Sequence, residues 1–129
     1  MIPVTSSSVT VLVVDDQPPF LRAARSVVDL TPGFEMIGEA ETGEEALERV
    51  EALAPDLVLM DINLPGINGV EAARRVIAAH PEIRVLLLST YAADDILGTA
   101  RSFGATYMKK EEFGPASLTK AWEQRPTRT

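Results

Sequence analysis

Short apolar runs alternate with amphipathic segments along most of this chain. Val11–Val14, Leu57–Met60 and Val85–Leu88 are continuously apolar, which is typical of strands that are buried on both faces of a parallel sheet. Between these runs, apolar residues recur every three or four positions, as in residues 46–53, which is the spacing of one helix face. The pattern therefore predicts five strands, each followed by a helix.

Turn and capping residues mark the ends of these elements. Pro18 and Pro19 suit the first turn of a helix. Thr42, with Glu45 three residues later, forms a capping box at the start of another. The strands are expected at about 10–14, 35–39, 57–60, 84–88 and 105–108, and the helices at about 18–30, 43–54, 70–79, 94–103 and 115–123.

We expect a single α/β domain over residues 9–123, between disordered tails at 1–8 and 124–129. Strand–helix alternation with short loops requires right-handed crossovers, which place helices on both faces of the sheet. Five strands favour a flavodoxin-like, doubly wound parallel sheet with the order 2-1-3-4-5. The first and third strands are then neighbours, and ligands bind such sheets in the crevice at the carboxyl ends of the strands.

Polar residues stand at the ends of four of the five strands. Asp15 and Asp16 follow the first strand, Asp61 follows the third, Ser89 follows the fourth, and Lys110 comes just after the fifth. Each alone is typical of a turn or a solvated surface, but this fold would bring them to one crevice. Crowded carboxylates repel one another unless a cation joins them, and oxygen ligands suit Mg²⁺. The combination predicts a magnesium-dependent phosphoryl-transfer site.

Composition narrows the functional classes. The net charge of −7 argues against direct binding of nucleic acid. The chain contains no cysteine, which excludes disulfides and thiolate chemistry. Because no apolar run is long enough to span a membrane and the first residues do not resemble a signal peptide, we expect a cytoplasmic protein that does not enter the membrane.

Four motifs together resemble the response regulator receiver domain, the phospho-acceptor half of two-component signalling, over residues 9–123. The acidic pair lies in Val-Val-Asp-Asp-Gln-Pro at 13–18, and the phosphorylation motif is Leu-Met-Asp-Ile-Asn-Leu-Pro-Gly-Ile-Asn-Gly at 59–69. The switch hydroxyl segment is Leu-Leu-Ser-Thr-Tyr at 87–91, and Gly-Ala-Thr-Tyr-Met-Lys-Lys at 104–110 resembles the segment of the switch aromatic and the lysine.

The resemblance also has one departure. The family usually has a proline after the lysine, often with a cis bond, whereas Glu111 follows Lys110 here. An acidic residue at that place resembles the branch with a helix-turn-helix output domain, so the cis-proline feature is not carried over. The resemblance implies Asp61 as phospho-acceptor, a Mg²⁺ ion bound by Asp15, Asp16, Asp61 and the backbone carbonyl of Asn63, Lys110 as a phosphate contact, and Ser89 and Tyr107 as the switch pair.

The function that follows is a receiver module rather than a metabolic enzyme. It would take a phosphoryl group from a histidine kinase or a phosphotransfer protein and catalyse only its own phosphorylation and slow dephosphorylation. The change would reach the surface of the fourth helix, fifth strand and fifth helix, where an output partner or a second copy would bind. The chain leaves open whether it acts alone or as part of a longer regulator.

Two other functions remain to be compared with this one. A Mg²⁺-dependent phosphohydrolase with an aspartyl nucleophile usually needs a second acid two residues later, and Asn63 occupies that position. A degenerate receiver that never takes phosphate is disfavoured by the complete acidic set with Lys110. Phe20, near the start of the first helix, either packs into the core or belongs to an apolar surface for a partner helix.

Overall fold

The computed structural model describes residues 8–90 and 94–124 and contains one five-stranded parallel sheet with the order β2-β1-β3-β4-β5. The predicted fold class and strand order are confirmed. The elements are β1 (Val9–Val14), α1 (Pro18–Leu30), β2 (Phe34–Ala40), α2 (Gly43–Leu53), β3 (Leu57–Asp61), α3 (Gly69–Ala79), β4 (Arg84–Ser89), α4 (Asp94–Ser102), β5 (Thr106–Lys109), the 3₁₀ helix η1 (Lys110–Glu112) and α5 (Pro115–Glu123).

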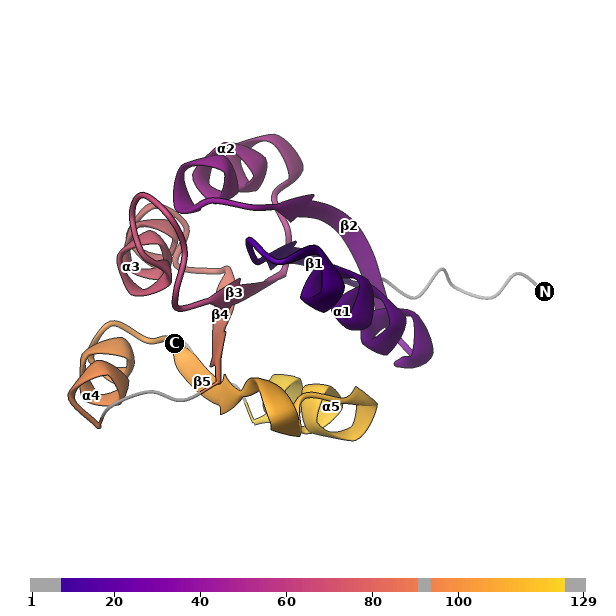
Figure 1. Cartoon of the computed structure of the whole chain (residues 1–129). Coiled ribbons are helices and arrows are strands. Elements are labelled where there is room, and N and C mark those ends of the chain that lie inside the picture. The colour runs from indigo at the N-terminus through magenta and orange to yellow at the C-terminus, as the bar shows by residue number, and fades with distance from the viewer. Residues whose placement is uncertain (1–7, 91–93, 125–129) are drawn as a thin grey trace.

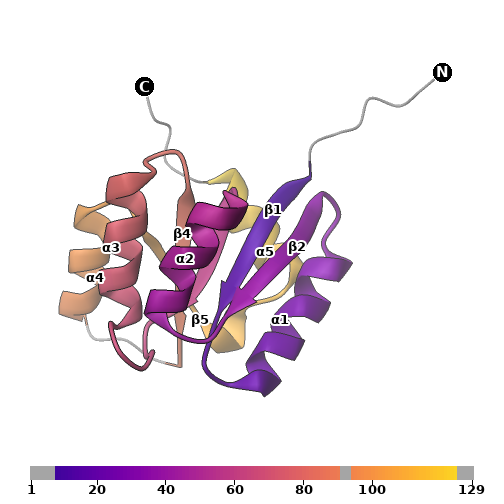
Figure 2. The same ribbon diagram turned by 90° about the horizontal axis from the view of Figure 1, so that it is seen from above.

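The helices cover both faces of the sheet, with α1 and α5 on one face and α2, α3 and α4 on the other (Figures 1 and 2). Successive residues of β1 alternate between these layers. Leu12 and Val14 pack into the core beneath α2 and α3, whereas Val11 and Val13 pack into the core beneath α1 and α5. Since both faces of this strand are dry, each fully buried side chain stabilises the fold by about 1.5–3 kcal/mol.

At the amino-terminal ends of the strands, hydrogen bonds between Thr10 and Asp56 help to set the relative positions of β1 and β3. The backbone N–H and the hydroxyl of Thr10 both donate to Asp56 Oδ2, at 3.0 and 3.1 Å. The backbone N–H of Asp56 donates in return to the Thr10 hydroxyl at 2.9 Å. Val14 pairs with Met60. The next residue of each strand segment, Asp15 and Asp61, therefore lies at the same carboxyl-terminal end of the sheet.

The boundaries differ from the predicted ones by one or two residues. The third strand includes Asp61 and the fourth includes Ser89, because the hydrogen-bonded ladder continues into the polar residues. Helix α3 begins at Gly69, since the Asn68 side chain caps it by accepting a hydrogen bond from the backbone N–H of Glu71 at 2.9 Å. The 3₁₀ helix η1 was not predicted. The predicted tails lie outside the described residues except for Ser8 and Gln124.

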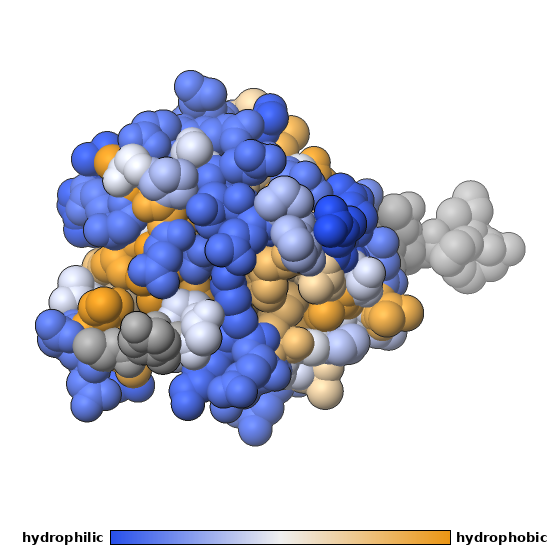
Figure 3. All heavy atoms as spheres, in the orientation of Figure 1, coloured by the Kyte–Doolittle hydropathy of each residue, from blue (hydrophilic) through white to orange (hydrophobic). Residues whose placement is uncertain are grey.

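The exterior of the domain is mostly hydrophilic in the view of Figure 3, and hydrophobic side chains gather between α3 and α4 and between α1 and α5. Ile62, Val70 and Ile96 line the first of these places, which is a groove. Phe20 and Phe113 meet in the second. Of the helices that the structure describes, none has both the length and the apolar character needed to cross a bilayer.

Helix α3 approaches the end of β3 so closely that only glycine fits at its first position. The backbone N–H of Gly69 donates to the carbonyl of Ile62 at 2.8 Å. A Cβ atom built on Gly69 would lie 1.9 Å from the carbonyl oxygen of Asp61, which is backbone and cannot swing aside. The glycine therefore allows the helix to hold the backbone of Asp61 in place.

We expect Gly69→Ala to lower the free energy of unfolding by about 1–3 kcal/mol, the usual cost of forcing extra volume into a packed site. Gly98→Ala is the matched control, because Gly98 lies within α4 and has open space around its Cβ position. That change should stabilise the protein by about 0.5–1 kcal/mol, since alanine is the better helix former. Urea unfolding of both variants tests this, and a Gly69→Ala protein as stable as the wild type would refute the steric argument.

Candidate functional site

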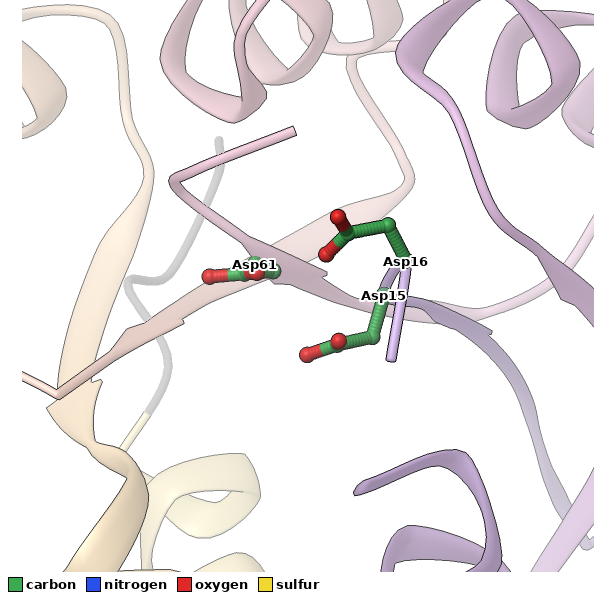
Figure 4. Close-up of side chains that lie close together, drawn as sticks. All are labelled: Asp15, Asp16 and Asp61. Carbon is green, nitrogen blue, oxygen red and sulfur yellow. The ribbon is translucent and has the colours of Figure 1, made fainter. Parts of the chain in front are cut away.

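Three aspartates from two neighbouring strands meet at the carboxyl edge of the sheet. Asp15 and Asp16 directly follow β1, and Asp61 is the last residue of β3. Their side chains converge (Figure 4), and one carboxylate oxygen from each lies within 4.8 Å of the others. Asp15 and Asp61 are buried, whereas Asp16 is exposed. The sequence thus predicted correctly that these three residues come together.

Backbone hydrogen bonds orient the two buried carboxylates. The N–H of Gln17 donates to Asp15 Oδ1 at 2.8 Å, and the N–H of Asn63 donates to Asp61 Oδ1 at 3.2 Å. In both cases the donor lies two residues after the acid, which is the local turn that aspartate favours. Each buried carboxylate therefore has one oxygen fixed by its own loop and a second oxygen that faces the shared site.

Lys110 brings the opposite charge from two strands away. It begins η1, just after β5, and its Nζ lies 2.7 Å from Asp15 Oδ2 and 3.6 Å from Asp61 Oδ2. Only 19% of the lysine side chain is exposed, so water screens these contacts less than it screens a surface ion pair. The prediction that Lys110 lies beside the aspartates is confirmed. The Lys110–Glu111 peptide bond is trans, as are the other peptide bonds of the described residues.

The site holds more negative charge than one ammonium group neutralises. The pKa of Asp61 is raised, first by burial and then by the charge of Asp15, with a smaller contribution from Asp16. The N–H of Asn63 and the charge of Lys110 act in the opposite direction but do not cancel the increase. A cluster of carboxylate oxygens with this excess charge fits a hard divalent cation, which binds oxygen ligands.

Ser89 and Tyr107 form a second polar pair beside this cluster. Ser89 ends β4 and is fully buried, while Tyr107 lies in β5 and is half-buried. The Tyr107 hydroxyl lies 3.4 Å from Ser89 Oγ, and its ring packs against the core beneath α2, α3 and α4. The tyrosine is therefore turned toward the serine instead of extending into water.

Phe20 also belongs to the site, although the sequence does not predict its contact with Lys110. Its ring lies beneath the ammonium group of Lys110, with 4.5 Å between Nζ and the ring centroid. An aromatic residue in the first turn of the helix that follows the acidic pair was the available signal. Phe20 also packs against the core formed with α1 and α5, so the core-packing alternative is confirmed for part of its surface.

Comparison with known proteins agrees with this geometry. The chain matches the family model described as "Response regulator receiver domain" over residues 11–123. The chain therefore belongs to the family of response regulator receiver domains, which are phospho-acceptor modules of two-component signalling. Phosphorylation and Mg²⁺ binding are typical of this family. The receiver domains of response regulators receive phosphate from histidine kinases.

Individual relatives place the chain near the regulators with a helix-turn-helix output. It is 36% identical over 109 residues to the transcriptional regulatory protein DegU of Brevibacillus brevis, covering 84% of this chain and 46% of that protein. It is 31% identical over 115 residues to the nitrate/nitrite response regulator NarL of Escherichia coli K12, covering 89% and 53%. The chain thus spans about half the length of the curated relatives that it matches.

A solved structure gives the same relationship. The signal receiver domain of the response regulator NarL from Mycobacterium tuberculosis superposes with a TM-score of 0.84 and 29% identity, covering 92% of this chain and 99% of that one. A LuxR-family response regulator from Aurantimonas sp. superposes with a TM-score of 0.81 and 30% identity, covering 91% and 84%. These likenesses support the receiver function over the phosphohydrolase alternative.

The raised pKa of Asp61 makes a prediction about stability. A carboxyl whose folded pKa exceeds its unfolded pKa binds more protons when folded, so metal-free stability falls as pH rises from the unfolded value through the folded one. Asp61→Asn removes the buried charge and keeps an oxygen for the Asn63 N–H. We expect it to raise the metal-free melting temperature at neutral pH by a few degrees, which corresponds to about 1 kcal/mol in a domain of this size.

Thermal melts in EDTA and in millimolar Mg²⁺ test this expectation. Asp61→Asn should also lose most of the stabilisation by Mg²⁺, which in the wild type grows as RT ln(1 + [Mg²⁺]/Kd). Asp16→Asn is the comparison variant, and its metal-free effect should be smaller because Asp16 is exposed and raises the Asp61 pKa least. The interpretation fails if Asp61→Asn melts below the wild type in EDTA and still gains fully from Mg²⁺.

Proposed function

We propose that this receiver accepts its phosphoryl group on Asp61. The observation that carries the proposal is the position of its carboxylate, which is buried between the charge of Lys110, at 3.6 Å, and the acidic pair that follows β1. A carboxylate oxygen of Asp61 would form a bond to the phosphorus while the bond from phosphorus to the donor's histidine nitrogen breaks. The nitrogen keeps the electron pair, and the product is an aspartyl phosphate.

The other charged residues would prepare the site for this transfer. Asp15, Asp16 and Asp61, with the backbone carbonyl of Asn63, would hold a Mg²⁺ ion. When bound, Mg²⁺ supplies the positive charge that phosphoryl transfer requires around the reacting oxygens. Lys110 would leave Asp15 Oδ2 and donate from its ammonium group to a phosphoryl oxygen, since it already reaches both aspartates. The residues thus divide binding and charge neutralisation between them.

Ser89 and Tyr107 would convert phosphorylation into a change of surface. The contact between their hydroxyl oxygens is long, at 3.4 Å, so it is weak. A charged phosphoryl oxygen is a stronger hydrogen-bond acceptor, and Ser89 Oγ would donate to it. A movement of Ser89 toward Asp61 would change the space available to the Tyr107 ring. The surface of α4, β5 and α5 would then differ between the two states.

Partners follow from this division of labour. The phosphoryl donor would be a histidine kinase or a phosphotransfer protein, and the receiver would work in the cytoplasm as the domain of residues 9–123. An output partner or a second copy would bind the surface of α4, β5 and α5, where Tyr107, Met108 and Lys120 line a groove. The net charge of −7 disfavours direct contact of this domain with nucleic acid. Beyond its own phosphorylation and dephosphorylation we assign no catalytic activity.

The acceptor is tested by replacing Asp61 with Asn, because an amide has nearly the same shape but is not nucleophilic. We expect the wild type to gain one phosphate from acetyl phosphate and Mg²⁺, and Asp61→Asn to gain none. Intact-mass spectrometry measures the adduct, and peptide mapping locates it. Asp29→Asn is the control, since Asp29 is exposed near the end of α1 and has no part in the site. A full-occupancy adduct on Asp61→Asn would show that another residue is the acceptor.

The switch is tested with Ser89→Ala, which keeps the charged residues and removes the hydroxyl. We expect this variant to take phosphate but to transmit little change to β5. Hydrogen exchange of the backbone amides in 94–109 should differ between the free and phosphorylated wild type, and that difference should be much smaller in Ser89→Ala. Equal differences in both proteins would exclude Ser89 from the switch.

A further inference from the structure

The ammonium group of Lys110 touches a neutral partner as well as two charged ones. Its Nζ lies 2.7 Å from Asp15 Oδ2 and 3.6 Å from Asp61 Oδ2, and the centroid of the Phe20 ring lies 4.5 Å from the same nitrogen. A cation within about 6 Å of a ring centroid and above its face is attracted by the ring's quadrupole. The lysine charge is therefore enclosed by two carboxylates and one aromatic face.

Phe20 is itself held from two sides. It lies in the first turn of α1, where Pro18 and Pro19 restrict the backbone that follows the acidic pair. On its other side the ring packs against Phe113, with 6.2 Å between centroids and 42° between ring planes. Phe113 follows η1 directly, so it belongs to the same short segment as Lys110. The aromatic pair thus connects the start of α1 to the segment that carries the lysine.

The ring differs from the carboxylates in how it responds to the reaction. A metal ion held by the acidic pair would compete with Lys110 for Asp15, and phosphorylation would change the charge and shape of Asp61. The Phe20 ring carries no formal charge and offers no oxygen ligand, so neither event removes it as a partner of the ammonium group. A partner that stays constant while the charged partners change can keep the ammonium group over the site.

We propose that Phe20 is a positioning residue whose ring face holds the Lys110 ammonium group against the acceptor site. It supports the lysine while the lysine exchanges Asp15 for a phosphoryl oxygen. This inference rests on the proposed role of Asp61 as acceptor. Phe20 would thus act through the negative charge density of its ring face, in addition to filling volume in the core.

Stepwise fluorination of the Phe20 ring tests the role directly, because fluorine withdraws density from the ring face while changing its size little. Incorporation of mono-, di- and trifluorophenylalanine at position 20 should slow phosphorylation by acetyl phosphate progressively, to a total of about two- to five-fold, the range expected for a cation–π contact at a partly exposed site. The rate constants are measured at saturating Mg²⁺ for each protein, so that metal affinity does not contribute.

Phe113 provides the matched control. The same fluorinated residues at position 113 alter the same aromatic pair, and the ring that lies beneath Lys110 keeps its own density. We expect the phosphorylation rate to stay within experimental error of the wild type in that series. Equal rates across the Phe20 series, or equal slowing in both series, would overturn the proposal and leave Phe20 a packing residue.

A second measurement does not depend on phosphorylation. In the metal-free protein, the protons on the carbon next to Nζ of Lys110 should resonate upfield of their usual position, because that nitrogen lies over the face of the Phe20 ring. Phe20→Leu should return them to the usual position, and Phe113→Leu should not. An unshifted resonance in the wild type would refute the contact. Failure of the wild type to take phosphate on Asp61 would instead refute the acceptor, and the resonance would still decide the contact.

Discussion

Two buried carboxylates held side by side, with a third at the rim, are the constraint on which the rest of this domain depends. Asp15 and Asp61 repel each other, and burial strengthens the repulsion because little water is present to screen it. The fold tolerates this arrangement for two reasons. Lys110 reaches both acids, and each acid accepts a hydrogen bond from the backbone N–H two residues later in its own loop. What remains is an excess of negative charge at the site, which favours the binding of a divalent cation.

Several features of the scaffold serve to keep these acids together. The Thr10–Asp56 pairing at the far edge sets how β1 and β3 lie along each other, and Gly69 lets α3 press on the backbone of Asp61. Neither feature touches the chemistry. The Thr10–Asp56 pairing matters because a shift of one residue between parallel strands would move every side chain of a strand to the opposite face.

The sequence was sufficient for the sheet and for most of the site, for physical reasons. Short, continuously apolar segments are typical of strands that are buried on both faces of a parallel sheet. The rules for connecting such strands then determine which strand ends are neighbours. These rules place Asp15, Asp16, Asp61 and Lys110 together from the sequence alone. What it could not supply were contacts that depend on side-chain rotamers and loop geometry. The ring of Phe20 beneath Lys110, the orientation of Tyr107 toward Ser89 and the 3₁₀ turn at η1 all result from local packing, which periodicity does not encode.

The interior position of β1 in the sheet has a consequence for how the domain acquires its structure. This strand is flanked by β2 and β3, and the last four residues of β1 pair with residues 57–60, more than forty positions later. Such pairing cannot form until the chain between has been made, and the closure of so long a loop delays it. During synthesis the apolar strand Val11–Val14 would therefore stay partly unpaired until β3 emerges, and in that interval it would be open to aggregation or to binding by chaperones.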